Sequence, residues 1–298
     1  MTENGHRPVL PTEVIEYLDA GRAGVYIDCT LGLAGHASLI LAKNPKNRLI
    51  GLDRDGLSLK VAQERLRPFA DRVTLFQADF KDLSALDIPG ENVRGVLADL
   101  GISSFQLDNA DRGFSYQHEG PLDMRADQRL RTTAAKVLHT YPEQRLAEMF
   151  ARYGELAQTR RLAREIVHLR KLGRLETTGD LRVLIERIYQ WRPQKGRIHP
   201  AAKAFQALRI EVNQELEGLA EFIDATVRRM AKGTRFVFIS FHSLEDRIVK
   251  KGFHALAAPE DGSPLLEVLT RKPVMASEAE VAANPRARSA KLRAAERL

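Results

Sequence analysis

Short apolar runs alternate with amphipathic segments through the first third of the chain. Parallel strands need crossover connections of this kind, so the alternation predicts a doubly wound α/β sheet. Two further β-type runs appear late in the chain, after a long region without any. The predicted strands cover residues 25–27, 48–52, 73–76, 93–98, 235–239 and 265–270.

A helical pattern separates the two groups of strands. Segments 142–153, 158–172 and 178–191 show apolar residues at spacings of three and four, with basic residues between them. We therefore expect an all-helical insertion over residues 125–210, inside an α/β domain formed by residues 1–124 and 211–298.

Four local features give more specific expectations. Thr12 is a plausible N-cap for a helix over 12–18, and Ser243 with Asp246 has capping-box spacing. The basic tail, 284–298, has a helical pattern. Residues 100–125 show neither the period of 2 of a strand nor the period of 3.6 of a helix. The segment is too long for an ordinary connection, which favours a functional loop.

Composition is that of a globular protein, with 44% hydrophobic and 29% charged residues among 298. No apolar run is long enough to cross a bilayer and no signal peptide is recognisable, so we expect no membrane association and a cytoplasmic location. The single cysteine, Cys29, follows a strand and fits a buried position better than a catalytic thiol. No Cys/His cluster has metal-ligand spacing, so no metal is expected.

The positive charge is concentrated in the helical region. Residues 129–210 hold 18 Lys and Arg against 7 Asp and Glu, whereas the whole chain has a net charge of only +7. A basic block beside a slightly acidic α/β domain favours a polyanionic partner such as nucleic acid. Solvated helix faces are the alternative.

The first strand–helix–strand unit has the features of a nucleotide-binding turn. Asp28 closes the first strand, Gly32 and Gly35 form the turn, and Asp53 closes the second strand, where a carboxylate can bind a ribose. A dehydrogenase would favour G-x-G-x-x-G, and Asp28 would repel a pyrophosphate. A cationic nucleoside, S-adenosyl-L-methionine (SAM), therefore fits better than NAD.

Other strand ends and turns add candidate residues. Asp79 and Phe80 follow the third strand and could frame an adenine, although Phe80 could equally be a core residue. Asp99 closes the fourth strand. His242 follows the fifth strand and belongs either to a helix start or to a site.

Several longer segments resemble one family. They are His6 to Leu10, Asp28 to His36, Asp99 to Asp108, Arg112 to Ser115, Gly120 to Arg125, His199 to Ala201, Phe205 to Asn213, Ser240 to Arg247 and Asn284 to Arg293. Together they span nearly the whole chain. On these segments the chain resembles the MraW (RsmH) family of bacterial 16S ribosomal RNA (cytosine-N4)-methyltransferases.

The resemblance implies a class I SAM-dependent methyltransferase fold with a helical insertion. It places cofactor contacts at Ala34, Gly35, His36, Asp53, Phe80, Asp99 and Gln106, beside Asp28 and Gly32 from the turn itself. One departure stands out, because Ala34 occupies a position where the family usually has glycine. The turn is then either in an ordinary backbone region or mildly strained.

The resemblance also implies the substrate, 16S rRNA in the small ribosomal subunit. Asp99 is expected to orient the cofactor or the target amine, with Ser103 and Ser104 as hydrogen-bonding groups unless they only cap the loop. Candidate substrate contacts are Phe114 and Tyr116 for stacking, Arg125 and Arg209 for phosphates, and Asn213 and His242.

Two other functions remain open at this point. The same scaffold could methylate amino groups of DNA or of another substrate, and a non-catalytic RNA-binding or assembly factor could keep SAM as a structural ligand. A homodimer is also left open.

Overall fold

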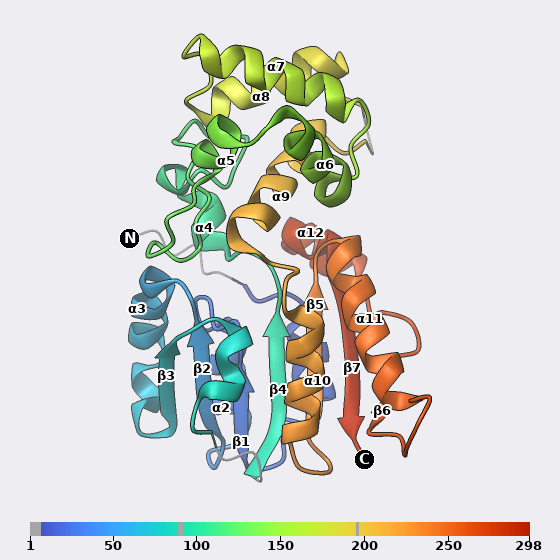
Figure 1. Cartoon of the computed structure of the whole chain (residues 1–298). Coiled ribbons are helices and arrows are strands. Elements are labelled where there is room, and N and C mark those ends of the chain that lie inside the picture. Colours follow the sequence, from blue (N-terminus) through green and yellow to red (C-terminus); the bar gives the residue numbers. More distant parts are fainter. Residues whose placement is uncertain (1–6, 89–91, 195–196) are drawn as a thin grey trace. The chain divides into compact units, whose positions relative to one another are not determined.

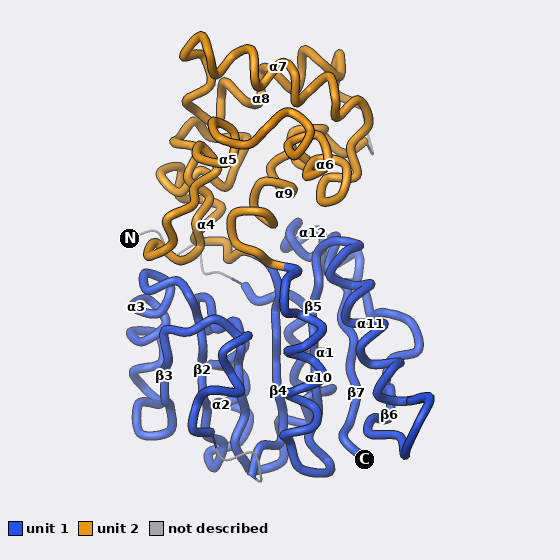
Figure 2. Tube along the Cα trace, in the orientation of Figure 1, with its two compact units in different colours: residues 1–101, 216–298 blue, residues 102–215 orange. Residues whose placement is uncertain are grey.

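The computed structural model describes residues 7–88, 92–194 and 197–298 (Figure 1). Residues 1–6, including His6, fall outside this description, as do Lys195 and Gly196 of the basic region. The chain forms two compact units, 1–101 with 216–298 and 102–215, coloured separately in Figure 2. The second unit begins earlier and ends later than the predicted insertion, 125–210.

The first unit contains a seven-stranded sheet in the order β3-β2-β1-β4-β5-β7-β6. Pairs among β1 to β5 are parallel, and β7 runs antiparallel to both of its neighbours. The six predicted strands are confirmed as β1 to β6, and β7 was not predicted. The bounds of the seven strands are β1 (Val25–Asp28), β2 (Arg48–Asp53), β3 (Val73–Gln77), β4 (Val93–Asp99), β5 (Arg235–Ser240), β6 (Leu266–Val268) and β7 (Lys291–Arg297).

Helices cover both faces of this sheet. Within β4, Val96 and Ala98 lie in the core that contains α10 and α11, whereas Leu97 lies in the core that contains α1 and α2. This alternation follows from the period of two along a strand and gives the near-continuous apolar runs of a doubly wound sheet. The helices are α1 (Pro11–Tyr17), α2 (Gly35–Lys43), α3 (Gly56–Arg65), α10 (Leu219–Arg229), α11 (Ser243–Ala257) and α12 (Glu278–Ala283), with 3-10 turns η1 (Arg67–Arg72), η2 (Phe80–Ala85) and η5 (Pro285–Ser289).

The end of the chain corrects the sequence prediction. The tail is not a basic helix, because Lys291–Arg297 forms β7, inserted between β5 and β6. Ala294 and Ala295 are fully buried on opposite faces, and Arg293 pairs with Asp246 of α11 at 2.6 Å. Burial in the sheet therefore overrides the helical propensity of this alanine-rich segment.

Two predicted caps are also wrong. Leu10, in the left-handed region, precedes α1, and Pro11 occupies its first turn, so Thr12 lies inside the helix. At α11 the N-cap is His242, whose ring nitrogen Nδ1 accepts a hydrogen bond from the backbone N–H of Glu245. Ser243 is the first residue of the helix proper.

The second unit is helical, and the three predicted helices are confirmed as α6, α7 and α8. The segment before them is not a free loop, since Phe114, Leu122 and Met124 are buried in the same core as the helices. This packing explains why the unit begins at Ile102. Its elements are α4 (Ser104–Asp108), η4 (Ala110–Arg112), α5 (Ala134–Thr140), α6 (Glu143–Gly154), α7 (Thr159–Lys171), α8 (Thr178–Tyr189) and α9 (Pro200–Asn213).

Candidate active site

Three acidic residues close adjacent parallel strands in the first unit. Asp28, Asp53 and Asp99 end β1, β2 and β4, which are neighbours in the sheet. Parallel strands share one carboxyl edge, where α/β proteins bind ligands. In the strand register Asp28 aligns with Gly51 and Leu97, so Asp53 and Asp99 each lie two residues further along their strands.

The carboxyl groups at this edge titrate far from their usual range. Burial, followed by repulsion from Asp28 and Glu245, raises the pKa of Asp99 to about 8. Burial, with repulsion from Asp53, raises the pKa of Asp28 to about 7. The pKa of Asp53 rises to about 6, again mainly through burial. Each group is stabilised in its neutral form, and a cation placed at this edge would reverse that preference.

The turn after β1 holds the backbone in the left-handed region twice. Gly32 has φ 52° and Ala34 has φ 60°. Ala34 is fully buried and immediately precedes α2, which begins at Gly35. Of the two possibilities left by the sequence, the strained one is present, at a cost of roughly 1–2 kcal/mol.

Hydrogen bonds tie this turn to the neighbouring strand ends. The N–H of Gly32 donates to Oδ2 of Asp53 at 2.7 Å, and the N–H of Thr30 donates to Oδ1 of Asp28 at 3.1 Å. Thr30 in turn accepts at Oγ1 from the N–H of Asp99 at 2.6 Å. These bonds fix the three strand ends relative to one another.

A histidine on α2 lies beside the carboxylate of β4. Nε2 of His36 is 3.7 Å from Oδ2 of Asp99, and the two side chains are 6% and 25% exposed. Asp99 is therefore the more accessible of the two. A partly exposed carboxylate beside a buried histidine is accessible to a ligand.

Phe80 has protein partners already. Its ring lies 4.9 Å from that of Phe222, and the ammonium of Lys81 lies 5.8 Å from its centroid. Asp79 caps η2 by accepting a hydrogen bond from the N–H of Lys81. Phe80 contacts the core while remaining half-buried, so adenine stacking stays a prediction.

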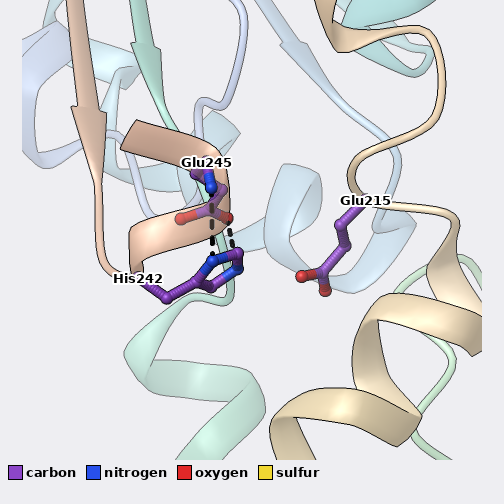
Figure 3. Close-up of side chains that lie close together, drawn as sticks. All are labelled: Glu215, His242 and Glu245. Carbon is purple, nitrogen blue, oxygen red and sulfur yellow. Dashed lines mark hydrogen bonds and ion pairs between the residues drawn. The ribbon is translucent and has the colours of Figure 1, made fainter. Parts of the chain in front are cut away.

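The end of β5 holds a buried histidine–glutamate pair (Figure 3). Nε2 of His242 lies 3.2 Å from Oε1 of Glu245, whose other oxygen accepts from the N–H of Phe241 at 3.0 Å. Glu245 also raises the pKa of Asp99. Sequence reasoning assigned no role to Glu245, although its place three residues after His242 is the spacing of a reciprocal helix cap.

In the second unit, Ser103 is a helix cap. Its hydroxyl accepts from the N–H of Gln106, while Oε1 of Gln106 accepts from the N–H of Ser103, which completes a capping box for α4. Ser104 is the first residue of that helix. Capping, the alternative considered for the serines, is thus present at Ser103, and the catalytic roles of both serines stay predictions.

The two aromatic candidates differ in exposure. Phe114 is 5% exposed, within the helical core. Tyr116 is half-buried and stacks on His199, with ring centroids 4.9 Å apart. Tyr116 is the more accessible of the two for a nucleobase, and stacking by either ring remains untested.

The predicted phosphate-binding arginines have internal partners. Arg125 makes a bidentate pair with Asp123, at 2.8 Å for both bonds. Arg209 pairs with the buried Glu215 at 2.9 Å. The amide of Asn213 accepts from the N–H of Ala126 and donates to the carbonyl of Met124, which ties α9 to the irregular segment. Substrate contacts by all three stay predictions.

The fold and the strand-end residues together define a class I methyltransferase. The seven-stranded order with one antiparallel strand, helices on both faces and acidic residues at three adjacent strand ends specify this class. The family model described as the MraW methylase family matches residues 3–298. The chain belongs to this family.

Relatives of similar length support the assignment. The Ribosomal RNA small subunit methyltransferase H of a Nostoc species is 46% identical over 98% of this chain and 92% of its own. The protein of the same name from Geotalea daltonii is 45% identical with full coverage of both chains. Among solved structures, an SAM-dependent O-methyltransferase from Thermotoga maritima is 10% identical, with a TM-score of 0.44, over 99% of this chain and 68% of that one.

S-adenosyl-L-methionine is the cofactor of this enzyme class, and the residues present fit it. Its sulfonium and ammonium groups are cations, and a nearby cation would stabilise the ionised forms of Asp28 and Asp99, which burial and neighbouring carboxylates disfavour. The individual cofactor contacts stay predictions for every candidate residue: Asp28, Gly32, Ala34, Gly35, His36, Asp53, Phe80, Asp99 and Gln106. In the described residues, no helix is long and apolar enough to span a membrane.

Proposed function

We propose that this protein methylates the exocyclic N4 of a decoding-centre cytosine in 16S ribosomal RNA, with the base flipped out of its stack. Relatives that match along nearly the full length of both chains are named as methyltransferases of small-subunit ribosomal RNA. That observation is the main support for small-subunit ribosomal RNA as the substrate. The cytosine and its N4 come from the family resemblance.

The chemistry calls for a group that engages an amine. The N4 lone pair of cytosine is delocalised into the ring, so the amine is a weak nucleophile. Holding it in line with the methyl donor can contribute roughly 7–11 kcal/mol to lowering the barrier. Extruding the base costs a few kcal/mol, least where the RNA is single-stranded or distorted. The bound cofactor supplies the methyl group on a sulfonium.

Asp99 is the group best suited to the amine. It closes β4, is a quarter exposed and titrates near neutral pH. As a carboxylate it accepts a hydrogen bond from the N4 amine and aligns its lone pair. When the new N–CH3 bond forms, N4 loses one proton, and the carboxylate of Asp99, whose ionised form the bound cation favours, accepts it.

The test is transfer of labelled methyl from SAM to small ribosomal subunits, free ribosomal RNA and DNA, followed by nucleoside analysis. Subunits from a strain lacking its own enzyme serve as acceptor. We expect N4-methylcytidine in the RNA and none in DNA. Label in DNA alone would contradict the RNA substrate, and label at another position would contradict the N4 assignment.

Variants at Asp99 test its role separately. Asp99→Asn keeps the shape but cannot take a proton, and we expect at least a hundredfold loss in kcat. The matched control, Asp71→Asn, removes an exposed carboxylate of η1 in the same unit and should keep normal turnover. Turnover by Asp99→Asn within threefold of the unaltered protein would exclude Asp99 as proton acceptor.

A further inference from the structure

One face of α7 is uniformly basic. At 3.6 residues per turn, five side chains fall within an arc of roughly 100° on this helix. All five are exposed, and Glu165, the only acidic residue in α7, lies outside the arc. We call them the α7 stripe: Arg160, Arg161, Arg164, His168 and Lys171.

The opposite side of α7 is fixed by packing. Leu162, Ala163 and Ile166 are fully buried in the helical core. Arg170, also off the stripe, donates hydrogen bonds to the carbonyls of Leu138 and Tyr141 near the end of α5. The orientation of the stripe toward solvent is therefore set by the fold of the second unit.

The members of the stripe have no internal acidic partner among the described residues. Throughout residues 7–88, 92–194 and 197–298, no carboxylate forms an ion pair with any of its five members, and Arg161 contacts only the amide oxygen of Gln158. Some other arginines of the second unit do have an acidic partner. Arg145 pairs with Glu211, Arg182 with Glu186 and Arg187 with Glu165.

A surface of this kind fits a polyphosphate backbone. From Arg160 to Lys171 the stripe runs about 17 Å along the helix axis, a length over which a nucleic acid carries several phosphates. Unpaired guanidinium groups gain most from such contacts, because no internal ion pair has to break first. Arg125 and Arg209, by contrast, would have to leave Asp123 and Glu215.

We propose that the α7 stripe binds phosphates of the substrate RNA, a proposal that rests on the RNA substrate proposed above. The contact is sequence-independent and contributes affinity rather than chemistry. Neutralising it raises KM for the RNA substrate and leaves kcat at saturation and SAM binding unchanged.

The experiment compares two variants of the full chain with equal loss of charge. The stripe variant carries Arg160→Gln, Arg161→Gln, Arg164→Gln and Lys171→Gln. The control carries Arg22→Gln, Arg145→Gln, Arg182→Gln and Arg228→Gln, four exposed arginines that each pair with a carboxylate. Circular dichroism and thermal melting establish that both remain folded.

Affinity for free 16S rRNA is measured against salt concentration, and KM and kcat are measured with small subunits. Each lost phosphate contact lowers the slope of log K against log salt by about 0.7–0.9, so the stripe variant should lose about 3. KM should rise at least tenfold, with the control within twofold of the unaltered protein. An unchanged slope and KM in the stripe variant, or equal losses in both variants, would overturn the proposal.

Failure of the RNA substrate itself gives a different result. In that case the unaltered protein transfers no methyl to subunits or to free 16S rRNA, and the stripe proposal falls with it. If the unaltered protein is active but the stripe variant and the control have the same salt slope and KM, the proposed function stands and the stripe has no part in RNA binding.

Discussion

At the scale of single residues, the chemistry of the first unit lies in carboxyl groups that resist ionisation. Asp28 and Asp99 have pKa values of about 7 and 8 because of burial first and then of repulsion, from Asp53 at Asp28 and from Asp28 and Glu245 at Asp99. A cation at this edge stabilises their ionised forms, so its binding must release protons. A positively charged ligand therefore relieves the repulsion between these carboxylates, which favours its binding.

The first prediction concerns the pH dependence of SAM binding. Raising the pH from 6 to 8.5 ionises Asp28 and Asp99 in the free protein, so the Kd for SAM should fall, by up to tenfold per pH unit for each group that titrates. The Kd for S-adenosylhomocysteine, which lacks the sulfonium, should fall less over the same pH range. Isothermal titration calorimetry at several pH values measures both ligands.

The Asp99→Asn variant provides the control for this assignment. It should lose the part of the dependence between pH 7 and 8.5 and keep the part that belongs to Asp28. A flat profile for the unaltered protein, or an unchanged profile in the variant, would contradict the role of these two carboxyl groups.

At the scale of elements, the irregular segment before the helices is held by close backbone contacts. A Cβ added at Gly113, which has φ +68°, would overlap the carbonyl oxygen of Pro121, and one added at Gly120 would overlap that of Ala110. Because the obstacle is backbone in both cases, no side-chain rotation relieves it. The segment therefore has one tightly packed conformation.

The second prediction compares two glycines of the second unit. Gly113→Ala adds a backbone clash to the strain of positive φ and should lower the free energy of unfolding by more than about 3 kcal/mol. Gly173→Ala, with φ +62° and nothing within 4 Å of the new Cβ, should cost only about 1 kcal/mol. Urea denaturation measures both, and equal losses would mean that the segment can move aside.

The elements also show which parts of the fold can be predicted from sequence. The strand β4 is a short apolar run and the helix α6 has apolar residues at spacings of three and four, so the sequence predicts both within two residues. Lys291–Arg297 has the local pattern of a helix, and only its pairing with β5 and β6 makes it a strand. Pairing between segments far apart in the chain leaves no local pattern, so the sequence of residues 291–297 indicates a helix where the fold has a strand.

The candidate site also has parts that the sequence reveals and parts that it does not. Asp28, Asp53 and Asp99 could be found because each ends a recognisable strand. The pairing of Arg125 with Asp123 and of Arg209 with Glu215 could not, because it depends on backbone and side-chain conformations that the residue types alone do not specify. The unpaired face of α7 was hidden for the same reason, since its charge is visible in the sequence while its lack of partners is not.

At the scale of the whole molecule, the predicted cofactor residues are divided unequally between the units. The turn after β1 and the three strand-end carboxyl groups belong to the first unit, whereas Gln106 belongs to the second. Gln106 is 4% exposed and its Oε1 already accepts from the N–H of Ser103. The two units should therefore respond differently to the cofactor.

The final prediction concerns hydrogen exchange with and without S-adenosylhomocysteine, followed by mass spectrometry of the full chain. Bound ligand should slow exchange at residues 28–36, 53–55 and 99–101, because these backbone N–H groups lie at the carboxyl edge of the sheet. Residues of α7 should exchange at unchanged rates, which makes this helix the internal control. Protection that spares the strand ends would contradict the site. Protection that also reaches 103–108 would support a cofactor contact by Gln106, and its absence there would reduce Gln106 to the capping role that its hydrogen bond to Ser103 already explains.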